Sequence, residues 1–134
     1  MPLPNRILVS CLTLILTGCS GIVQMMPRDS GKVYSGIVHG SLFGSGMMTV
    51  TIDGEDFTGP IVRTSSSGGG EFIQKYGRGD MSFASLSAGV ATVKGILSSQ
   101  SGRGLRCEFV STGDGGGGIC VDDKSHVFDA IVTR

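Results

Sequence analysis

The chain has 134 residues, of which 23 are Gly, and its 11 Lys and Arg residues balance its 11 Asp and Glu residues. This length fits a single domain. Aromatic residues make up only 6% of the chain and Trp is missing, so the basic charge and the stacking platforms of a nucleic-acid binder are both lacking. We therefore expect no nucleic-acid partner.

The N-terminus carries one positive residue, Arg6, followed by an apolar run over residues 7–16. This run has the size of the apolar core of a secretory signal peptide. It is too short to span a bilayer core of about 30 Å. A buried N-terminal helix is the alternative interpretation. The run ends in the tetrapeptide Leu-Thr-Gly-Cys at residues 16–19.

This tetrapeptide resembles the lipobox of bacterial lipoproteins, in which an aliphatic residue, a small residue and Gly or Ala precede a Cys. The resemblance covers residues 1–20 and implies that 1–18 are a cleaved signal peptide and that Cys19 is acylated. Two or more acyl chains give stable membrane attachment. In Gram-negative members an Asp after the Cys favours the inner membrane, so Ser20 implies the outer membrane, on its periplasmic or its surface face.

Residues 19–31 show no sustained hydrophobic period and are interpreted as a lipidated tether, which leaves 32–134 as one domain. The many Gly residues disfavour helices, and no convincing helical pattern follows the signal. Alternating apolar and polar residues predict a first strand over 33–39 and a second over 47–53.

A hairpin over residues 47–64 is the clearest local prediction. The dipeptide Asp53-Gly54 is typical of a two-residue type I′ turn. Pairing across this turn places two pairs of residues opposite each other: Val50 with Phe57, and Thr51 with Asp56. Pro60 has no backbone N–H, which predicts an edge or a bulge at that point of the returning strand.

Residues 65–87 are rich in Ser and Gly, with 71–76 fitting either a short strand or a turn. A long irregular stretch in a small domain is often functional or disordered. Further alternating patterns predict strands over 89–98, 105–109, 119–122 and 126–133. About seven short strands separated by turn signals indicate an all-β fold, either a small antiparallel sandwich or a small barrel.

Of the four Cys residues, only Cys107 and Cys120 follow the lipobox, and an exported domain keeps disulfides. A two-residue turn at 113–114 would place them opposite each other, and the bond would stabilise by roughly 3 kcal/mol. The same register puts apolar and charged side chains on one face: Ile119 and Val121 beside Arg106 and Glu108. A bulge or a wider loop in 115–118 would relieve this conflict. Two Cys alone are insufficient ligands for a metal.

The only histidines are His39 and His126, and a Ser–His or Cys–His catalytic group would need one of them. His126 follows Asp122 and Asp123 in a sequence typical of a solvated hairpin loop. The Gly run at 115–118 resembles a phosphate cradle but leads into a strand rather than a helix.

Carboxylates gather near the predicted turns: Asp53, Glu55, Asp56, Asp114, Asp122 and Asp123. Such clusters can bind Ca²⁺, but their spacing does not match an EF-hand, and turn chemistry alone explains them. The tripeptide Arg-Gly-Asp at 78–80 resembles an integrin ligand, although a Gly-rich turn explains it equally well. We expect no catalytic residue, no metal site and no cofactor.

These patterns predict a membrane-anchored lipoprotein of the bacterial cell envelope that acts as a non-catalytic binding or structural module with an envelope protein as partner. The body also resembles small Gly-rich lipoproteins of unassigned function, through the turn at 53–54, the two later Cys and the lipobox. Strand addition at sheet edges is one way to capture a partner. Two alternatives stay open: an inhibitor of an envelope-degrading enzyme that inserts the 65–87 segment, and a weak hydrolase using His126 or His39.

Overall fold

The structure is a computed structural model that describes residues 20–40, 45–64, 75–76, 91–112 and 115–134. The predictions made for residues 1–19, for the tripeptide at 78–80, for Asp114 and for most of 65–87 lie outside these ranges. The strands in the described part are β1 (Ser20–Pro27), β2 (Tyr34–Gly40), β3 (Ser45–Ile52), β4 (Glu55–Thr64), β5 (Ala91–Ser98), β6 (Gly104–Thr112), β7 (Gly115–Asp122) and β8 (Val127–Thr133).

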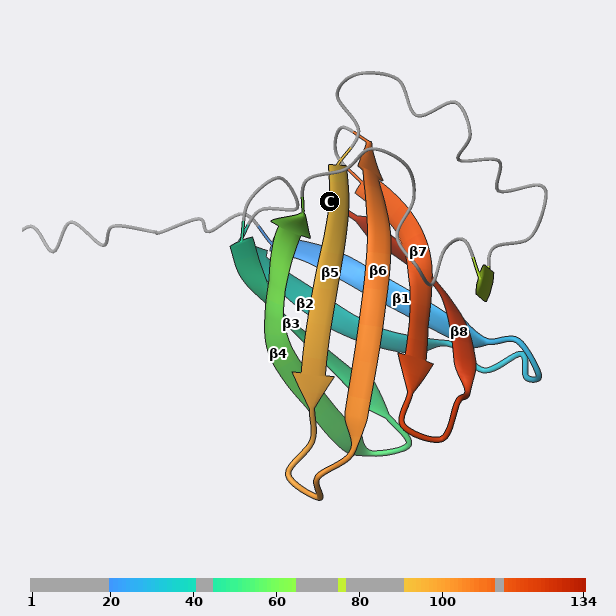
Figure 1. Ribbon diagram of the computed structural model, residues 1–134. Helices are drawn as coiled ribbons and strands as arrows, with labels where there is room; N and C mark the ends of the chain where they lie inside the picture. The colour runs from blue at the N-terminus through green and yellow to red at the C-terminus, as the bar shows by residue number, and fades with distance from the viewer. Residues whose placement is uncertain (1–19, 41–44, 65–74, 77–90, 113–114) are drawn as a thin grey trace, which may run out of the picture.

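Each strand pairs in antiparallel fashion with its neighbours in the chain, and β1 also pairs with β8, so that the sheet closes into a barrel (Figure 1). The all-β prediction is confirmed, and of the two architectures that the sequence left open, sandwich and barrel, the structure is the barrel. Within the described strands no edge is free. Capture of a partner by strand addition therefore loses its structural basis, because it needs an unpaired edge.

The prediction of an irregular tether over 19–31 is wrong for Ser20–Pro27, which form β1. This strand pairs with both β2 and β8, and its Val23 and Met25 side chains are buried in the core. Its outward residues Ile22 and Met26 are apolar as well. Alternation was therefore not visible in the sequence, and the barrel begins at residue 20 rather than at 32.

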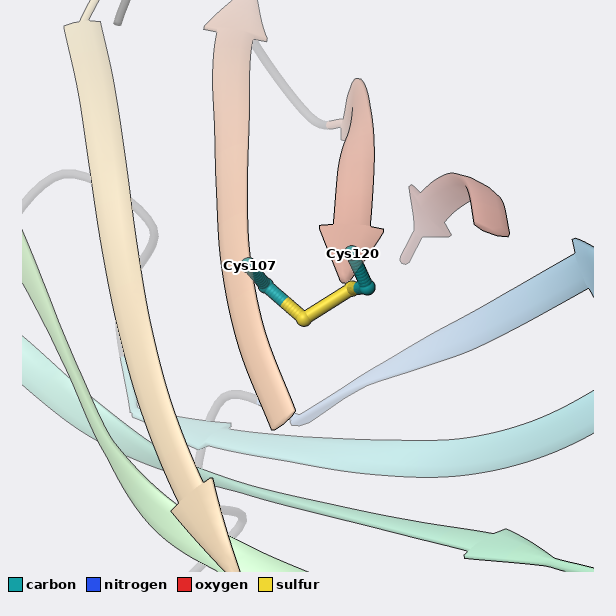
Figure 2. Close-up of a disulfide and its surroundings, with 2 residues drawn as sticks. All are labelled: Cys107 and Cys120. Carbon is teal, nitrogen blue, oxygen red and sulfur yellow. A yellow bond between two sulfur atoms is a disulfide. The ribbon is translucent and has the colours of Figure 1, made fainter. Parts of the chain in front are cut away.

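Inward-facing side chains fill the barrel. An interior formed by about eight strands is just wide enough for side chains to occupy it completely. The buried core draws on every strand, and its largest fully buried members are Phe57, Phe109, Met25, Met48, Ile61, Leu97, Leu105 and Ile119, the last of these on the outer face. The side chains of Cys107 and Cys120 lie inside this core and form the predicted disulfide, which links β6 to β7 (Figure 2).

The predicted β3–β4 hairpin is confirmed in its register, with Val50 opposite Phe57 and Thr51 opposite Asp56. Asp53 and Gly54 have φ angles of 50° and 80°, as a type I′ turn requires. The expectation for Pro60 is wrong. Its strand pairs on both sides, and the register with β5 is the same before and after this residue, so neither an edge nor a bulge is present.

The β6–β7 pair keeps one register throughout, with Cys107 opposite Cys120. The bulge or wider loop expected in residues 115–118 is wrong, because these glycines belong to β7. Ile119 and Glu108 face each other on the outer side of the barrel, and both are buried although they point away from the interior. The mixed face that the sequence implied is therefore real: Ile119, Val121 and Glu108 are buried in it, whereas Arg106 is exposed.

The barrel has two unlike ends. The connections 28–33, 53–54, 99–103 and 123–126 join consecutive strands at one end, called here the hairpin end (Figure 1). Ser20, where β1 starts, and Thr133, where β8 stops, lie at the opposite end, called here the terminal end. The antiparallel order of the strands places every described hairpin connection away from the terminal end.

Candidate functional site at the hairpin end

A hollow of about 350 Å³ opens at the hairpin end of the barrel. Its lining comes from all four hairpin connections and the strand ends beside them. The buried side chains of Ile52 and Phe128 belong to this lining, and the Tyr34 ring meets Phe128 edge-on with ring centroids 6.3 Å apart. Apolar and aromatic groups therefore support a rim that is otherwise polar and charged.

Asp122, the last residue of β7, organises the β7–β8 connection. Its Oδ1 accepts hydrogen bonds from the backbone N–H groups of Lys124 (2.9 Å) and His126 (2.8 Å). Its Oδ2 lies 2.8 Å from His126 Nδ1. Asp side chains commonly bond the backbone two residues on. This fold of the connection is completed by Ser125, which has a φ of 63°.

The side chain of Asp122 is only 4% exposed. Burial disfavours its charged form and is the largest single influence on its pKa, but the hydrogen bonds from His126 and Lys124 together outweigh it. The pKa of Asp122 is therefore held below its ordinary value, and the group is an anion at neutral pH. An ionised carboxylate only accepts, so Nδ1 of His126 carries the proton of this contact.

Arg103, from the β5–β6 connection, joins opposite sides of the hairpin end. Its guanidinium lies 3.1 Å from Asp122, 3.3 Å from Asp123 and 3.6 Å from Glu55. It also lies over the Phe57 ring, 5.6 Å from the centroid, at a distance where cation–π attraction operates. This one cation is thus matched by several carboxylates and holds the loops together.

Tyr34 at the start of β2 donates a hydrogen bond from its hydroxyl to Asp53 Oδ1, at 2.8 Å. This bond, with smaller contributions from desolvation and from the charges of Asp53 and Asp29, raises the pKa of Tyr34 above its ordinary value. The phenol therefore stays protonated and acts as a fixed donor. The contact ties the β3–β4 turn to the wall of the hollow.

The two histidines lie at opposite ends of the barrel. His39 on β2 pairs with Ser20 and Met47 near the terminal end, whereas His126 is at the hairpin end. They therefore do not form one site. Among the described side chains, no Ser, Thr or Cys forms a hydrogen bond with His126.

Of the predicted carboxylates of the turns, Asp114 lies outside the described residues, and the other five gather at the hairpin end, each with a protein partner. Asp53 bonds Tyr34, Asp56 bonds Thr51 (2.6 Å), and Glu55 bonds Ser101. Across the ranges that the structure describes, no three His, Cys, Asp or Glu side chains are grouped as a metal site would need. The Gly run at 115–118 lies in a paired strand.

Sequence reasoning missed Tyr34, Arg103 and Phe128 as contributors to this site. They come from three different connections or strand starts, and only closure of the barrel brings them together. The described part of the chain contains no helix with the length and hydropathy needed to cross a membrane. No protein family, no curated protein and no solved structure was found to match this chain.

Proposed function

We propose that the protein is a lipid-anchored module of the bacterial cell envelope that acts by binding rather than by catalysis, with the hairpin end as its binding surface. The observation that carries the proposal is the position of Cys19. This residue ends the lipobox-like motif and is joined directly to Ser20, the first residue of β1 at the terminal end.

Acyl chains on Cys19 would hold the terminal end against the bilayer with almost no slack in the chain. Because barrel strands are tilted, each residue advances roughly 2.5 Å along the barrel axis, so the eight residues of β1 would set the hairpin end roughly 20 Å from the lipid surface. The hollow with its charged rim would then open away from the membrane, toward soluble or wall-bound partners.

The packing of the barrel supports binding at this end rather than inside. Buried side chains from every strand occupy the interior, including the Cys107–Cys120 disulfide. A ligand could not enter without displacing the core, which would cost several kcal/mol.

The anchoring half of the proposal is tested by labelling growing cells with radioactive palmitate and separating membranes from soluble fractions. We expect label and membrane retention in the wild type, and loss of both in Cys19→Ser. Cys11→Ser is the matched control, because Cys11 lies inside the expected signal peptide and should leave both unchanged. Unlabelled wild-type protein would contradict the proposal.

The destination is tested by density separation of the two membranes. We expect the wild type in the outer membrane and a Ser20→Asp variant in the inner membrane.

The binding half is tested by crosslinking in living cells, followed by recovery of the acylated protein. A recurrent envelope partner that is lost when exposed residues at the hairpin end are changed supports the proposal. Recovery of the same partner from those variants contradicts it.

A further inference from the structure

Charged side chains of both signs line the hollow at the hairpin end. Asp29 and Asp53 lie on the side formed by the β1–β2 and β3–β4 connections, beside the Tyr34 ring. Lys124 and His126 lie on the side formed by the β7–β8 connection. Lys32 also lines the hollow, and it belongs to the Asp29 side.

Neighbouring protein groups leave part of this charge unmatched. Arg103 and Asp122, which line the same hollow, neutralise each other at 3.1 Å. Asp29, Lys32 and Lys124 are exposed, and within the described residues their charged groups form no ion pair. Asp53 accepts the Tyr34 hydroxyl, but no cation of the described residues lies at ion-pair distance from it. Among the described residues nothing supplies the complementary charge, which leaves these groups open to solvent ions or to a ligand.

We propose that this hollow binds a small zwitterionic ligand, one that carries both an ammonium group and a carboxylate, as an amino acid or a short free peptide does. Asp29 and Asp53 would receive the ammonium group, with the Tyr34 ring beside it. Lys124 would receive the carboxylate. The inference rests on the proposed function only in taking the hairpin end as the binding end.

Size and preorganisation support this ligand class. A volume of about 350 Å³ lies at the lower end of the range of small-molecule sites, and it suits a dipeptide rather than a chain of sugars. The positions that would meet the ligand are held in place, because Asp53 is bonded to Tyr34 and the backbone N–H of Lys124 to Asp122. Fixed positions reduce the ordering cost of binding.

The test is titration calorimetry on the full chain, purified in the form in which cells accumulate it, with leucyl-glycine as the probe in its L and D forms. Two capped versions remove one charge each: N-acetyl-leucyl-glycine and leucyl-glycine amide. Because each ion pair in the hollow depends on one of these charges, we expect either cap to weaken binding about tenfold or more. Equal affinity for free and capped probes, or no binding at millimolar concentration, would overturn the proposal.

Variants show which side of the hollow binds each charged group of the ligand. Lys124→Gln should reduce the penalty of the amide cap but keep that of the acetyl cap, and Asp29→Asn, which leaves Asp53 in place, should do the reverse. Asp56→Asn is the matched control, since Asp56 lines a separate hollow at the same end and should change neither penalty. Identical effects of all three variants would contradict the assignment. Binding is measured on purified protein, so this outcome is independent of whether Cys19 is acylated.

Discussion

Cys107 and Cys120 face each other across β6 and β7 with their Cα atoms 4.0 Å apart, and their disulfide lies inside the barrel rather than on its surface. Both residues are no more than 1% exposed. A reductant in solution reaches such a bond only when the barrel opens. The bond therefore acts as part of the core and also constrains the chain when the core is lost.

Removing this disulfide should destabilise the barrel by about 3 kcal/mol, because the unfolded chain regains the freedom of the loop that the bond closes. The variant is Cys107→Ala together with Cys120→Ala, and the measurement is urea unfolding followed by circular dichroism. As a control, wild-type protein that is first unfolded and then reduced, so that the reductant can reach the disulfide, should refold with the same unfolding midpoint as the variant. An unchanged unfolding midpoint would contradict the expectation.

Deleting residues 20–27 from the domain should abolish folding. The deletion removes β1, takes Val23 and Met25 out of the core, and leaves β2 and β8 as open edges. Unpaired edges expose backbone groups that favour aggregation. Size-exclusion chromatography and proteolysis of the shortened chain check this, and a monomeric, protease-resistant product would show that the strand is dispensable.

Two adjacent glycines of β7 should respond in opposite ways to Ala. A Cβ at Gly118 would collide with the carbonyl oxygen of Glu108 on β6, whereas a Cβ at Gly117 would come no closer than 3.8 Å to the carbonyl oxygen of Ala130. We expect Gly118→Ala to cost at least about 2 kcal/mol, as overpacking does. Gly117→Ala should stabilise by about 0.5 kcal/mol, because it stiffens the unfolded chain. Thermal unfolding of the two variants tests this expectation, and equal melting temperatures would refute the steric argument.

Asp122 should make the free energy of unfolding depend on pH in the acidic range. Its folded pKa lies below its ordinary value of 3.8, so its contribution is complete above that pH and is lost as the pH falls through the folded pKa. At neutral pH, Asp122→Asn should lower the free energy of unfolding by about 2 kcal/mol, since hydrogen bonds to a charged acceptor weaken. The difference from the wild type should shrink below pH 3.8. Asp123→Asn, at an exposed position, should show a smaller effect, and a constant difference across the whole pH range would contradict this reading.

Tyr34 should titrate at higher pH when Asp53 is charged. The hydrogen bond to Asp53 is the main cause of its raised pKa, so Asp53→Asn should lower that pKa toward the ordinary value of 10.0. The absorbance of tyrosinate follows the titration, and subtraction of a Tyr34→Phe variant isolates this residue from Tyr76. The proposed contact is wrong if the Asp53→Asn curve coincides with that of the wild type.

Local patterns predicted those parts of the fold that depend on few residues. The β3–β4 register followed from Asp53-Gly54 and the alternation on both sides, and the disulfide followed because only Cys107 and Cys120 come after the lipobox in a domain expected to be exported. β1 was missed because both of its faces carry apolar residues. The position of Pro60 was misjudged because a proline within a strand signals an edge only in open sheets, and closure is a property of the whole chain.

The candidate site was less accessible to prediction than the fold. His126 and Asp122 are close in sequence, and their contact could be expected from turn chemistry. Tyr34 with Asp53, and Arg103 with Asp122, come from separate connections, and they meet only because the four hairpin loops share one end of a closed barrel. A barrel places loops by shear and tilt, and neither is visible in a local pattern.

The pairing of β1 with β8 imposes an order on how this molecule can assemble. Every other strand pair joins neighbours in the chain, whereas Ile22 pairs with Thr133, which is separated from it by nearly the whole length of the sequence. Contacts of such separation form late, because the intervening chain must first be ordered. A chain that emerges N-terminus first from a ribosome or a translocation channel can therefore form its hairpins one after another. The seam between β1 and β8 closes only when the final strand has arrived.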